Sequence, residues 1–270
     1  MMTMQRRFWV VVLLLGLVGC GLALKPAATE SVHLMLGNPS NATTNLLNAD
    51  NYLMIKPPYA LSYNNRKHTP NWVSWQLNAS WLGTVERRND FRPDDSLPSS
   101  WYHVLPGDYT GSGFDRGHMS PSGDRTNTPE NNSATFLMTN ILPQAKDNNQ
   151  GPWEQLERYC RSLAQQGKEL YIVAGGYGTK RVLRKGQIVA PTNTWKVVVV
   201  LDRVNAGVQA ITDQTRVIAV NLPNIEGIKE TDWRNYRVSV DAIEAVTGYN
   251  LLSNVRDSIQ AVLESRIDTQ

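Results

Sequence analysis

The feature that most constrains the fold is a set of short apolar runs rich in β-branched residues. Residues 196–201 have the sequence Lys-Val-Val-Val-Val-Leu, and residues 169–174 and 216–220 are runs of the same kind. Such near-continuous runs are typical of strands that are covered on both faces. Residues 71–77 instead alternate apolar and polar side chains, which also indicates a strand. A further strand is predicted over residues 134–142, so the sequence predicts a central sheet.

Helical patterns separate these strands. Pro152 suits the first turn of a helix and Gly167 suits its end. The apolar residues between them form one stripe at helical spacing: Trp153, Leu156, Cys160 and Leu163. Two more helices are predicted, from Val240 to Val246 before Gly248, and from Val255 to Ile267. The predicted fold class is therefore α+β, with a central sheet flanked by helices.

The first 24 residues predict an export signal. Arg6 and Arg7 precede an uncharged apolar run, residues 8–18, that is too short for a typical membrane-spanning helix. Residues 17–20, Leu-Val-Gly-Cys, resemble a bacterial lipobox, in which the signal is cut before a cysteine that then carries a lipid. The alternative is an ordinary signal peptide cut near Ala23. Both interpretations predict an extracytoplasmic protein.

After the signal, one domain is expected. Residues 25–31 resemble a short tether, and no internal repeat or low-complexity linker divides residues 32–270. The chain has two cysteines. If Cys20 is lipidated or removed, Cys160 has no partner, which excludes a disulfide framework and a four-thiolate zinc site. The formal charge of +3 falls by two without the signal's arginines, so global charge does not argue for a nucleic-acid partner.

The densest polar stretch, residues 115–126, holds the best candidate for catalysis. His118 is one of four histidines and the only one placed between arginines and glycines, in a setting that favours a loop. A lone histidine is more often structural or merely exposed. The flanking arginines favour catalysis, because phosphate chemistry needs both a base that works near neutral pH and fixed positive charge.

A second polar stretch follows, where a strand is expected to lead through a loop into the helix after Pro152. Asn149 stands just before that helix, and its amide oxygen is a hard ligand suited to magnesium. Glu157 and Arg161 lie one turn apart at the edge of the apolar stripe. Spacing alone leaves the alternatives open: a helix N-cap for Asn149, and an ordinary surface ion pair for Glu157 and Arg161.

Taken together, these motifs resemble the DNA/RNA non-specific endonuclease family, the ββα-metal or His-Me finger nucleases. The resemblance covers essentially the whole mature chain and rests on residues 115–118 (Asp-Arg-Gly-His), 139–140 (Thr-Asn), 147–149 (Asp-Asn-Asn) and the Trp and Leu-Glu of residues 153–157, with residues 59–64 and 81–83 in support. It implies a mostly antiparallel central sheet with a ββα-metal motif. It also implies a sugar- and sequence-non-specific endonuclease that leaves 5′-phosphates and uses Mg²⁺, with Mn²⁺ able to substitute.

The resemblance implies roles for the metal and proton-transfer residues. His118 matches the general base that takes a proton from the attacking water. Asn149 matches the sole direct protein ligand of the metal. Glu157 matches an acid that holds some of the metal-bound waters.

The resemblance also implies roles for three arginines and an asparagine. Arg87 matches an arginine that stabilises the transition state, although the neighbouring Arg88 leaves the choice between them open; Arg87 is favoured. Arg116 and Arg161 match arginines near the scissile phosphate, and Asn140 is expected to support the site from its strand. DNA and RNA are the implied partners, a protein inhibitor is plausible, and membrane contact is expected only through a lipid on Cys20.

Two other classes of function fit the sequence less well. An exported solute-binding lipoprotein would fit the export signal but would leave the polar stretch at residues 115–126 without a purpose. A zinc hydrolase is disfavoured, because no His-Glu-x-x-His pattern exists and the four histidines are scattered. Residues 175–178, Gly-Gly-Tyr-Gly, follow a strand but match neither the P-loop nor the dinucleotide fingerprint, and no Gly-x-Ser-x-Gly elbow is present.

Overall fold

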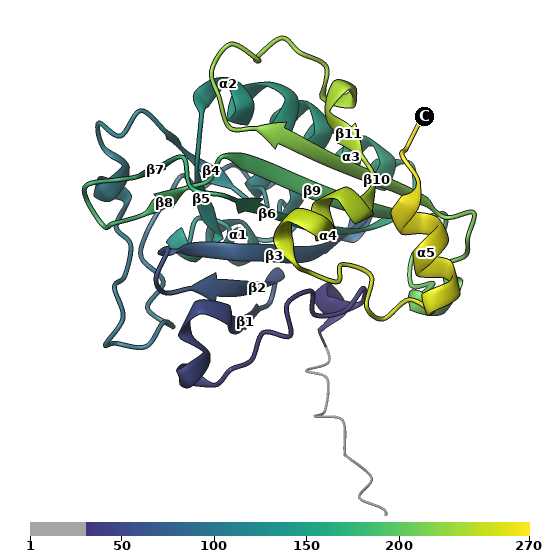
Figure 1. Cartoon of the computed structure of the whole chain (residues 1–270), viewed down its shortest axis with the longest axis horizontal. Helices are drawn as coiled ribbons and strands as arrows, with labels where there is room; N and C mark the ends of the chain where they lie inside the picture. The colour runs from purple at the N-terminus through teal and green to yellow at the C-terminus, as the bar shows by residue number, and fades with distance from the viewer. Residues whose placement is uncertain (1–30) are drawn as a thin grey trace, which may run out of the picture. The chain divides into compact units, whose positions relative to one another are not determined.

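The computed structural model describes residues 31–270. The predicted export signal, the lipobox at Cys20 and the tether before residue 31 lie outside the described residues. A seven-stranded sheet of order β1-β2-β3-β6-β9-β10-β11 dominates the described part, and all its neighbouring strands are antiparallel (Figure 1). Its strands are β1 (Tyr52–Lys56), β2 (Tyr59–Asn64), β3 (Thr69–Leu77), β6 (Glu169–Tyr177), β9 (Asn193–Leu201), β10 (Arg216–Pro223) and β11 (Arg237–Val238).

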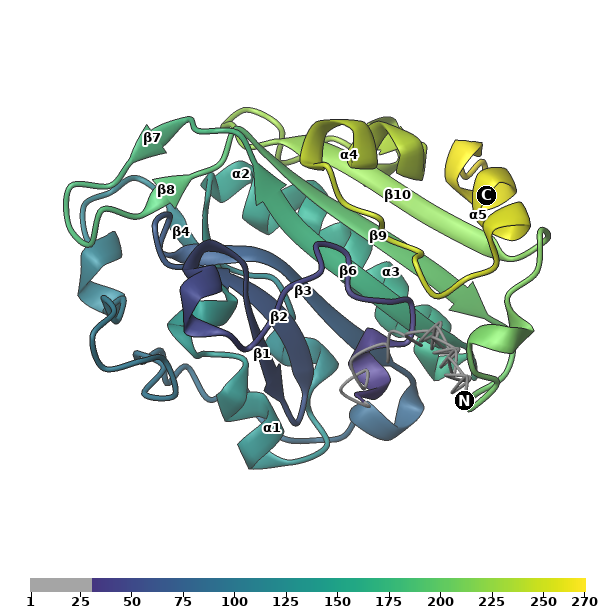
Figure 2. The ribbon, with the colours of Figure 1, turned by 60° about the horizontal axis from the view of Figure 1, so that its bottom comes forward.

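Helices cover both faces of this sheet. Helix α3 (Glu154–Gln165) packs on one face, while α4 (Val240–Thr247) and α5 (Asp257–Ser265) pack on the other (Figure 2). Strand β9 shows how the sequence produces two cores: Val198 and Val200 join the cluster that contains the apolar side of α3, and Val197 and Val199 join the cluster under α4 and α5. The prediction of strands covered on both faces is therefore confirmed, and so is the α+β class.

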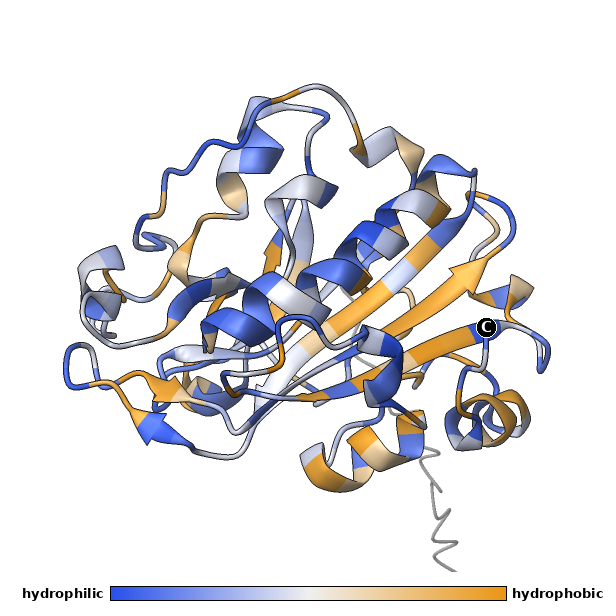
Figure 3. Ribbon diagram, turned by 90° about the horizontal axis from the view of Figure 1, so that it is seen from above, coloured by the Kyte–Doolittle hydropathy of each residue, from blue (hydrophilic) through white to orange (hydrophobic). Residues whose placement is uncertain are grey.

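The predicted core strands are confirmed, and the helices are confirmed with shifted ends. The four runs at residues 71–77, 169–174, 196–201 and 216–220 lie within β3, β6, β9 and β10. Figure 3 shows long hydrophobic stretches in the strands of the central sheet. Helix α3 begins at Glu154 because the residues before it form a wide π-type turn, Asn149–Trp153. Helix α4 ends as predicted at Gly248, whose left-handed φ of 72° suits glycine.

The strand predicted over residues 134–142 is wrong for most of its length. Helix α1 (Pro129–Ala134) ends where it was expected to begin, a 3₁₀ turn follows at Met138–Asn140, and strand β5 (Ile141–Gln144) starts only afterwards. Local hydrogen bonds explain the difference. Thr135 Oγ1 donates to the carbonyl of Asn132 at 2.7 Å, and Asn140 Nδ2 donates to the carbonyl of Thr135 at 2.8 Å. Such side-chain bonds to the backbone compete with strand pairing.

His118 lies on a strand, which corrects the expectation of a loop. Strand β4 (Asp115–His118) pairs antiparallel with β5, so that Asp115 faces Gln144 and His118 faces Ile141. The short helix α2 (Lys146–Asn148) and the wide turn then lead into α3. The polar sequence of β4 has no strand periodicity, so its conformation depends on pairing with β5.

A second small hairpin, β7 (Arg181–Val182) with β8 (Val189–Ala190), follows β6 and lies near β4 and β5 (Figures 1 and 2). Cys160 is buried and unpaired, and burial raises the pKa of its thiol to about 12. No helix between residues 31 and 270 is long and apolar enough to cross a membrane.

Candidate active site

Strand β4, the wide turn and α3 surround a hollow of about 480 Å³. The residues that line it include six of the seven predicted site residues: Arg87, Arg116, His118, Asn149, Glu157 and Arg161. The hollow therefore collects groups from a loop, a strand, a turn and a helix that are distant in sequence.

His118 ends β4 and faces this hollow from a nearly closed position, with 7% of its surface exposed. Its ring packs edge-on against Phe136, 4.8 Å between centroids, and beside Phe91 at 5.2 Å. Its Nε2 atom is buried without a hydrogen-bond partner among the described residues. Burial, together with the charges of Arg87 and Arg116, lowers the pKa of His118 to about 3. The imidazole is therefore neutral near pH 7 and able to accept a proton, and a bound phosphate anion would offset the arginine charges.

Asn149 is oriented by Asp115 at the start of β4. The Asp115 carboxylate accepts hydrogen bonds from Asn149 Nδ2 at 2.9 Å and from Gln150 Nε2 at 2.8 Å. Because the Asn149 nitrogen is engaged, its amide oxygen is left available as a ligand. The helices on either side have Ala145 and Trp153 at their N-cap positions, so the N-cap interpretation of Asn149 is wrong.

Glu157 belongs to a buried ionic network, so the interpretation as an ordinary surface ion pair is wrong. Its side chain lies between Lys196, with Nζ 3.6 Å from Oε1, and Arg161, with Nη1 4.0 Å from Oε2. Arg161 also bonds Asp124 at 3.0 Å. Burial raises the pKa of Glu157, while the Lys196 and Arg161 cations act in the opposite direction.

Two arginines, Arg87 and Arg116, pack against the aromatic rings that surround His118. The Arg87 guanidinium lies 4.8 Å above the Phe136 ring and donates to Ser122 Oγ at 2.8 Å. The Arg116 guanidinium lies 4.2 Å above the Phe91 ring. Arg87 lines the hollow and Arg88 does not, which agrees with the choice of Arg87 from the sequence.

Asn140 does not line the hollow and sits in the 3₁₀ turn before β5, not on a strand. It is fully buried, its Oδ1 accepts from the Ser120 amide at 3.0 Å, and its Nδ2 donates to the Ser120 carbonyl at 2.8 Å. These bonds fix the backbone just after His118. Asn140 is therefore a positioning residue and not a catalytic one.

Two residues that contact the predicted site residues, Lys196 and Asp124, were not predicted from the sequence. Lys196 is 1% exposed, and its ammonium lies 4.0 Å from the centre of the Trp153 ring as well as beside Glu157. Asp124 receives Trp75 Nε1 at 3.0 Å in addition to Arg161. Two sequence features could have indicated these residues: Lys196 begins the apolar run of residues 196–201, and Asp124 is the second aspartate of the polar stretch at residues 115–126.

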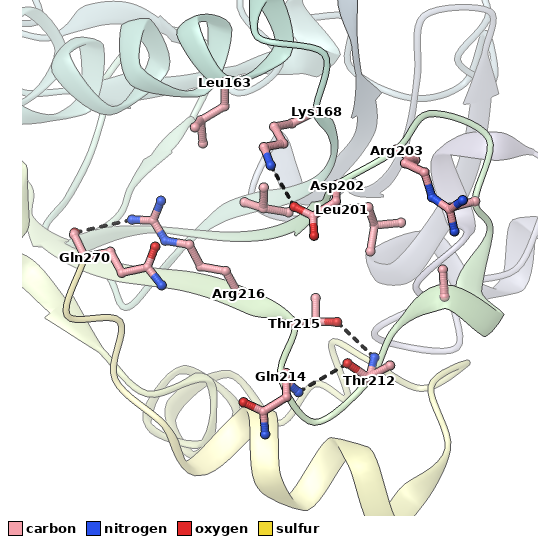
Figure 4. A pocket seen from close by; sticks show the side chains of 13 residues that line it. Leu163, Lys168, Leu201, Asp202, Arg203, Thr212, Gln214, Thr215, Arg216 and Gln270 are labelled. Atoms are coloured by element: carbon pink, nitrogen blue, oxygen red, sulfur yellow. Dashed lines mark hydrogen bonds and ion pairs between the residues drawn. The ribbon is translucent and has the colours of Figure 1, made fainter.

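A larger hollow of about 560 Å³ lies at the other end of α3, beside the segment that connects β9 to β10 (Figure 4). Two of its three cations are paired, Lys168 with Asp202 at 2.7 Å and Arg216 with Asp268 at 2.8 Å, whereas the third, Arg203, forms no ion pair within residues 31–270. No histidine or cysteine lines it. This second hollow therefore offers no imidazole base comparable to His118.

Two antiparallel strands followed by a helix, with a histidine on the first strand, define the ββα-metal class of nuclease. The sequence profile of the DNA/RNA non-specific endonuclease family matches residues 36–258. A nuclease of Nostoc sp. (strain PCC 7120) is 56% identical over 259 residues, which cover 93% of this chain and 94% of the relative. The chain belongs to the DNA/RNA non-specific endonuclease family, and it is a nuclease.

Two further comparisons agree. Nuclease C1 of Cunninghamella echinulata var. echinulata is 30% identical, over 82% of this chain and 86% of the relative. A crystal structure of an EndoG/EndoGI complex contains a chain that superposes with a TM-score of 0.71 at 22% identity, over 85% of this chain and 94% of that chain. At that identity the likeness shows the fold alone.

Proposed function

We propose that the protein hydrolyses phosphodiester bonds of both DNA and RNA, without preference for sequence or sugar. One observation carries the proposal. The buried, unpartnered Nε2 of His118 lies in the same hollow as Asn149, Glu157 and three arginines. Membership of a nuclease family also removes the alternative of a solute-binding lipoprotein.

In the proposed reaction, His118 takes a proton from the water that attacks phosphorus. General-base catalysis of this kind contributes about 10²–10⁴-fold to the rate. Arg87, Arg116 and Arg161 stabilise the negative charge that develops on the phosphoryl oxygens, because cations already in position need no reorganisation when that charge appears.

The residues of the hollow fit a single Mg²⁺ ion. The Asn149 amide oxygen would bind it directly, and the Glu157 carboxylate would hold waters of its shell, in keeping with the preference of Mg²⁺ for oxygen ligands and retained water. When bound, the ion would supply positive charge that stabilises the leaving group. Cleavage of the bond between phosphorus and the 3′ oxygen would leave a 5′-phosphate and a 3′-hydroxyl on the products. Mn²⁺, which favours the same donor atoms, is expected to substitute.

Indifference to sequence follows from the kinds of group in the hollow. Guanidinium groups bind backbone phosphates, which carry no sequence information directly. A site that neither requires nor rejects the 2′-hydroxyl would accept both sugars.

We further propose that the protein acts outside the cytoplasm, anchored by a lipid on Cys20, and that a protein inhibitor exists. The lipobox at residues 17–20 supports the first. The solved EndoG/EndoGI complex, a structure of an inhibited relative in fold, supports the second.

The decisive test is the substitution His118→Ala. Turnover on plasmid DNA and on RNA should fall by about 10²–10⁴-fold, whereas nucleic-acid affinity and melting temperature stay close to the wild type. Affinity should persist because the arginines make the phosphate contacts. A His103→Ala variant, changed outside the hollow, controls for the loss of an imidazole.

Wild-type assays complete the test. The purified mature protein should degrade double-stranded DNA, single-stranded DNA and RNA with Mg²⁺, and a chelator should stop it. The product ends should carry 5′-phosphate. Activity that survives exhaustive chelation, or a folded His118→Ala protein with most of its turnover, would contradict the mechanism.

A further inference from the structure

The β7–β8 hairpin carries a cluster of cations that the proposed reaction does not use. Arg181, Arg184 and Lys185 are exposed and rim a hollow of about 530 Å³. The carboxylate that lines the same hollow is Asp108, which already accepts hydrogen bonds from Tyr102 Oη and from the Leu105 amide. We call this surface the hairpin cleft.

Buried contacts hold the backbone of the hairpin against the rest of the fold. Leu183 and Ile188 on its underside are buried in a cluster with Val104 and Tyr109, from the segment that leads to β4. The carbonyl oxygen of Gly186 at its tip lies 2.6 Å from His68 Nδ1. The cleft is therefore attached to the same framework as the active-site strand.

The hairpin cleft also continues into the active site. A hollow of about 390 Å³ lies between them and shares Thr110 with the cleft and Arg116 and Asn149 with the active-site hollow. Phe114 lines this connecting hollow, and the Arg181 guanidinium lies 4.8 Å above its ring. Cations and aromatic rings therefore line the way from the hairpin to His118. The one carboxylate of the connecting hollow, Asp115, already accepts hydrogen bonds from Asn149 and Gln150.

None of the three hairpin cations forms an ion pair within residues 31–270. Their positive charge is therefore available to a ligand. Cations spaced along a groove that also contains aromatic rings are typical of surfaces that follow a single-stranded nucleic-acid backbone.

We propose that the hairpin cleft is a second binding site for substrate phosphates, which holds the nucleic-acid strand beyond the scissile bond. The inference rests on the proposed nuclease function and adds a site outside the catalytic hollow. A long substrate reaches both the catalytic hollow and the cleft, whereas a dinucleotide occupies the catalytic hollow alone. The cleft therefore makes the enzyme favour long strands.

The test compares two double variants with the same change of charge. Arg184→Ala/Lys185→Ala removes cations of the cleft, and Arg203→Ala/Arg256→Ala removes exposed arginines elsewhere. Neither pair belongs to the catalytic hollow. Steady-state kinetics are measured from low to high salt on a dinucleotide and on single-stranded DNA of about 20 nucleotides, a length beyond one typical binding site.

For the hairpin pair, kcat/KM on the long strand should fall about ten-fold near 0.1 M salt, through KM. The logarithmic salt dependence should weaken by about 0.7 for each lost phosphate contact. Cleavage of the dinucleotide and the melting temperature should not change, and the control pair should match the wild type.

Equal salt effects in both pairs would overturn the proposal, because general charge would then explain them. An equal loss on the dinucleotide would also overturn it, since the damage would then lie in the catalytic hollow. If the wild type cleaves both substrates and the hairpin pair behaves like it, only the cleft is refuted. If the wild type cleaves neither, the proposed function fails first and the cleft with it.

Discussion

The Asp115 side chain shows how a single hydrogen bond can decide the chemistry of a neighbouring residue. Asn149 can offer either its oxygen or its nitrogen to the hollow, and the Asp115 carboxylate accepts from the nitrogen at 2.9 Å. A carboxylate has no donor, so only one orientation of the Asn149 amide satisfies this bond. The orientation of the proposed metal ligand is therefore set by a residue that need not touch the metal.

Asp115→Asn should weaken metal binding more than it impairs turnover. The new amide can accept or donate, so the Asn149 amide can rotate and present its nitrogen. Loss of a group that orients a ligand typically costs about 10–100-fold in metal affinity. The Mg²⁺ concentration for half-maximal activity should rise by that factor, with much of kcat recovered at saturating Mg²⁺.

Asp147→Asn is the matched control. Asp147 is close to Asn149 in the sequence, but its carboxylate accepts a hydrogen bond from the Gly227 amide. An unchanged Mg²⁺ requirement in Asp115→Asn would remove the orienting role. So would an equal increase in both variants.

At the residue scale, the sequence could identify the proposed catalytic and metal-binding residues. It could not identify the buried residues that contact and position them. His118, Asn149 and Glu157 belong to recognisable motifs, and the structure brings them to one hollow. Lys196 could not be assigned, because its role depends on which face of β9 meets α3. That pairing is a property of the tertiary structure.

At the element scale, the wide turn at Asn149–Trp153 is the joint that places Asn149 before α3. Gly151 has non-helical angles, φ −121° and ψ −116°, and packs against the backbone of Lys229. A Cβ atom there would lie 2.6 Å from the Lys229 carbonyl oxygen, closer than atoms tolerate. The turn therefore requires glycine for close approach.

Gly151→Ala should destabilise the protein by about 1–3 kcal/mol, the usual cost of overpacking. For a domain of this size that lowers the melting temperature by about 2–4 °C per kcal/mol. The Mg²⁺ requirement should rise as well, because Asn149 shares the displaced turn. Gly107→Ala, where a Cβ atom has nothing within 4 Å, is the control for calorimetry and kinetics. Equal melting temperatures in the two variants would contradict the prediction.

The packing of α4 on α5 has a consequence for stability against pH. Carboxylate oxygens of Asp241, Glu244 and Glu264 all lie within 4.8 Å of one another. Burial, reinforced by the charges of Glu244 and Asp241, raises the pKa of Glu264 from 4.5 to about 7. The folded protein therefore binds this proton more tightly than the unfolded chain does. The stabilisation is complete below pH 4.5 and is lost as the pH rises through 7.

Glu264→Gln should remove this part of the pH dependence. Relative to the wild type, the variant should gain stability as the pH rises from 4.5 to 8, by about 1 kcal/mol after allowance for solvent screening. Chemical denaturation across that range measures the difference. The exposed Glu230→Gln serves as the control, and parallel stability curves for Glu264→Gln and wild type would contradict the assignment.

Helices and strands could be predicted where burial produces a regular spacing of apolar residues in the sequence. They could not be predicted where a segment adopts its conformation by pairing with a distant part of the chain. Strands β9 and β10 are apolar because both of their faces are covered, and the sequence shows this directly. Strand β4 is a polar strand that pairs with β5, and its own sequence has no strand periodicity. The apolar run near Phe136 predicts a strand, yet Phe136 packs against His118 from a turn.

At the scale of the whole molecule, the central sheet separates the catalytic hollow from the second hydrophobic core. Helix α3 and the catalytic hollow lie on one face, while α4 and α5 close the other core. The layers followed from strand and helix periodicity. The ββα arrangement came only from the family resemblance, since no periodic pattern marks it.

At the same scale, the N-terminal sequence predicts where the whole protein resides. Residues 8–18 are apolar but too short to span a bilayer, and Leu-Val-Gly-Cys at residues 17–20 fits lipid attachment at Cys20. A single acyl chain binds membranes only marginally, so stable anchoring needs more than one chain. With a lipid of two or more chains on Cys20, nuclease activity should fractionate with membranes, and the intact mass should show a lipid-modified N-terminus at Cys20. Cys20→Ala should move the protein out of the lipid-modified form without changing the specific activity of the folded domain, because the catalytic hollow lies within residues 87–161. A free N-terminus near Ala23, with wild-type activity in the soluble fraction, would contradict the anchor and establish cleavage by an ordinary signal peptidase.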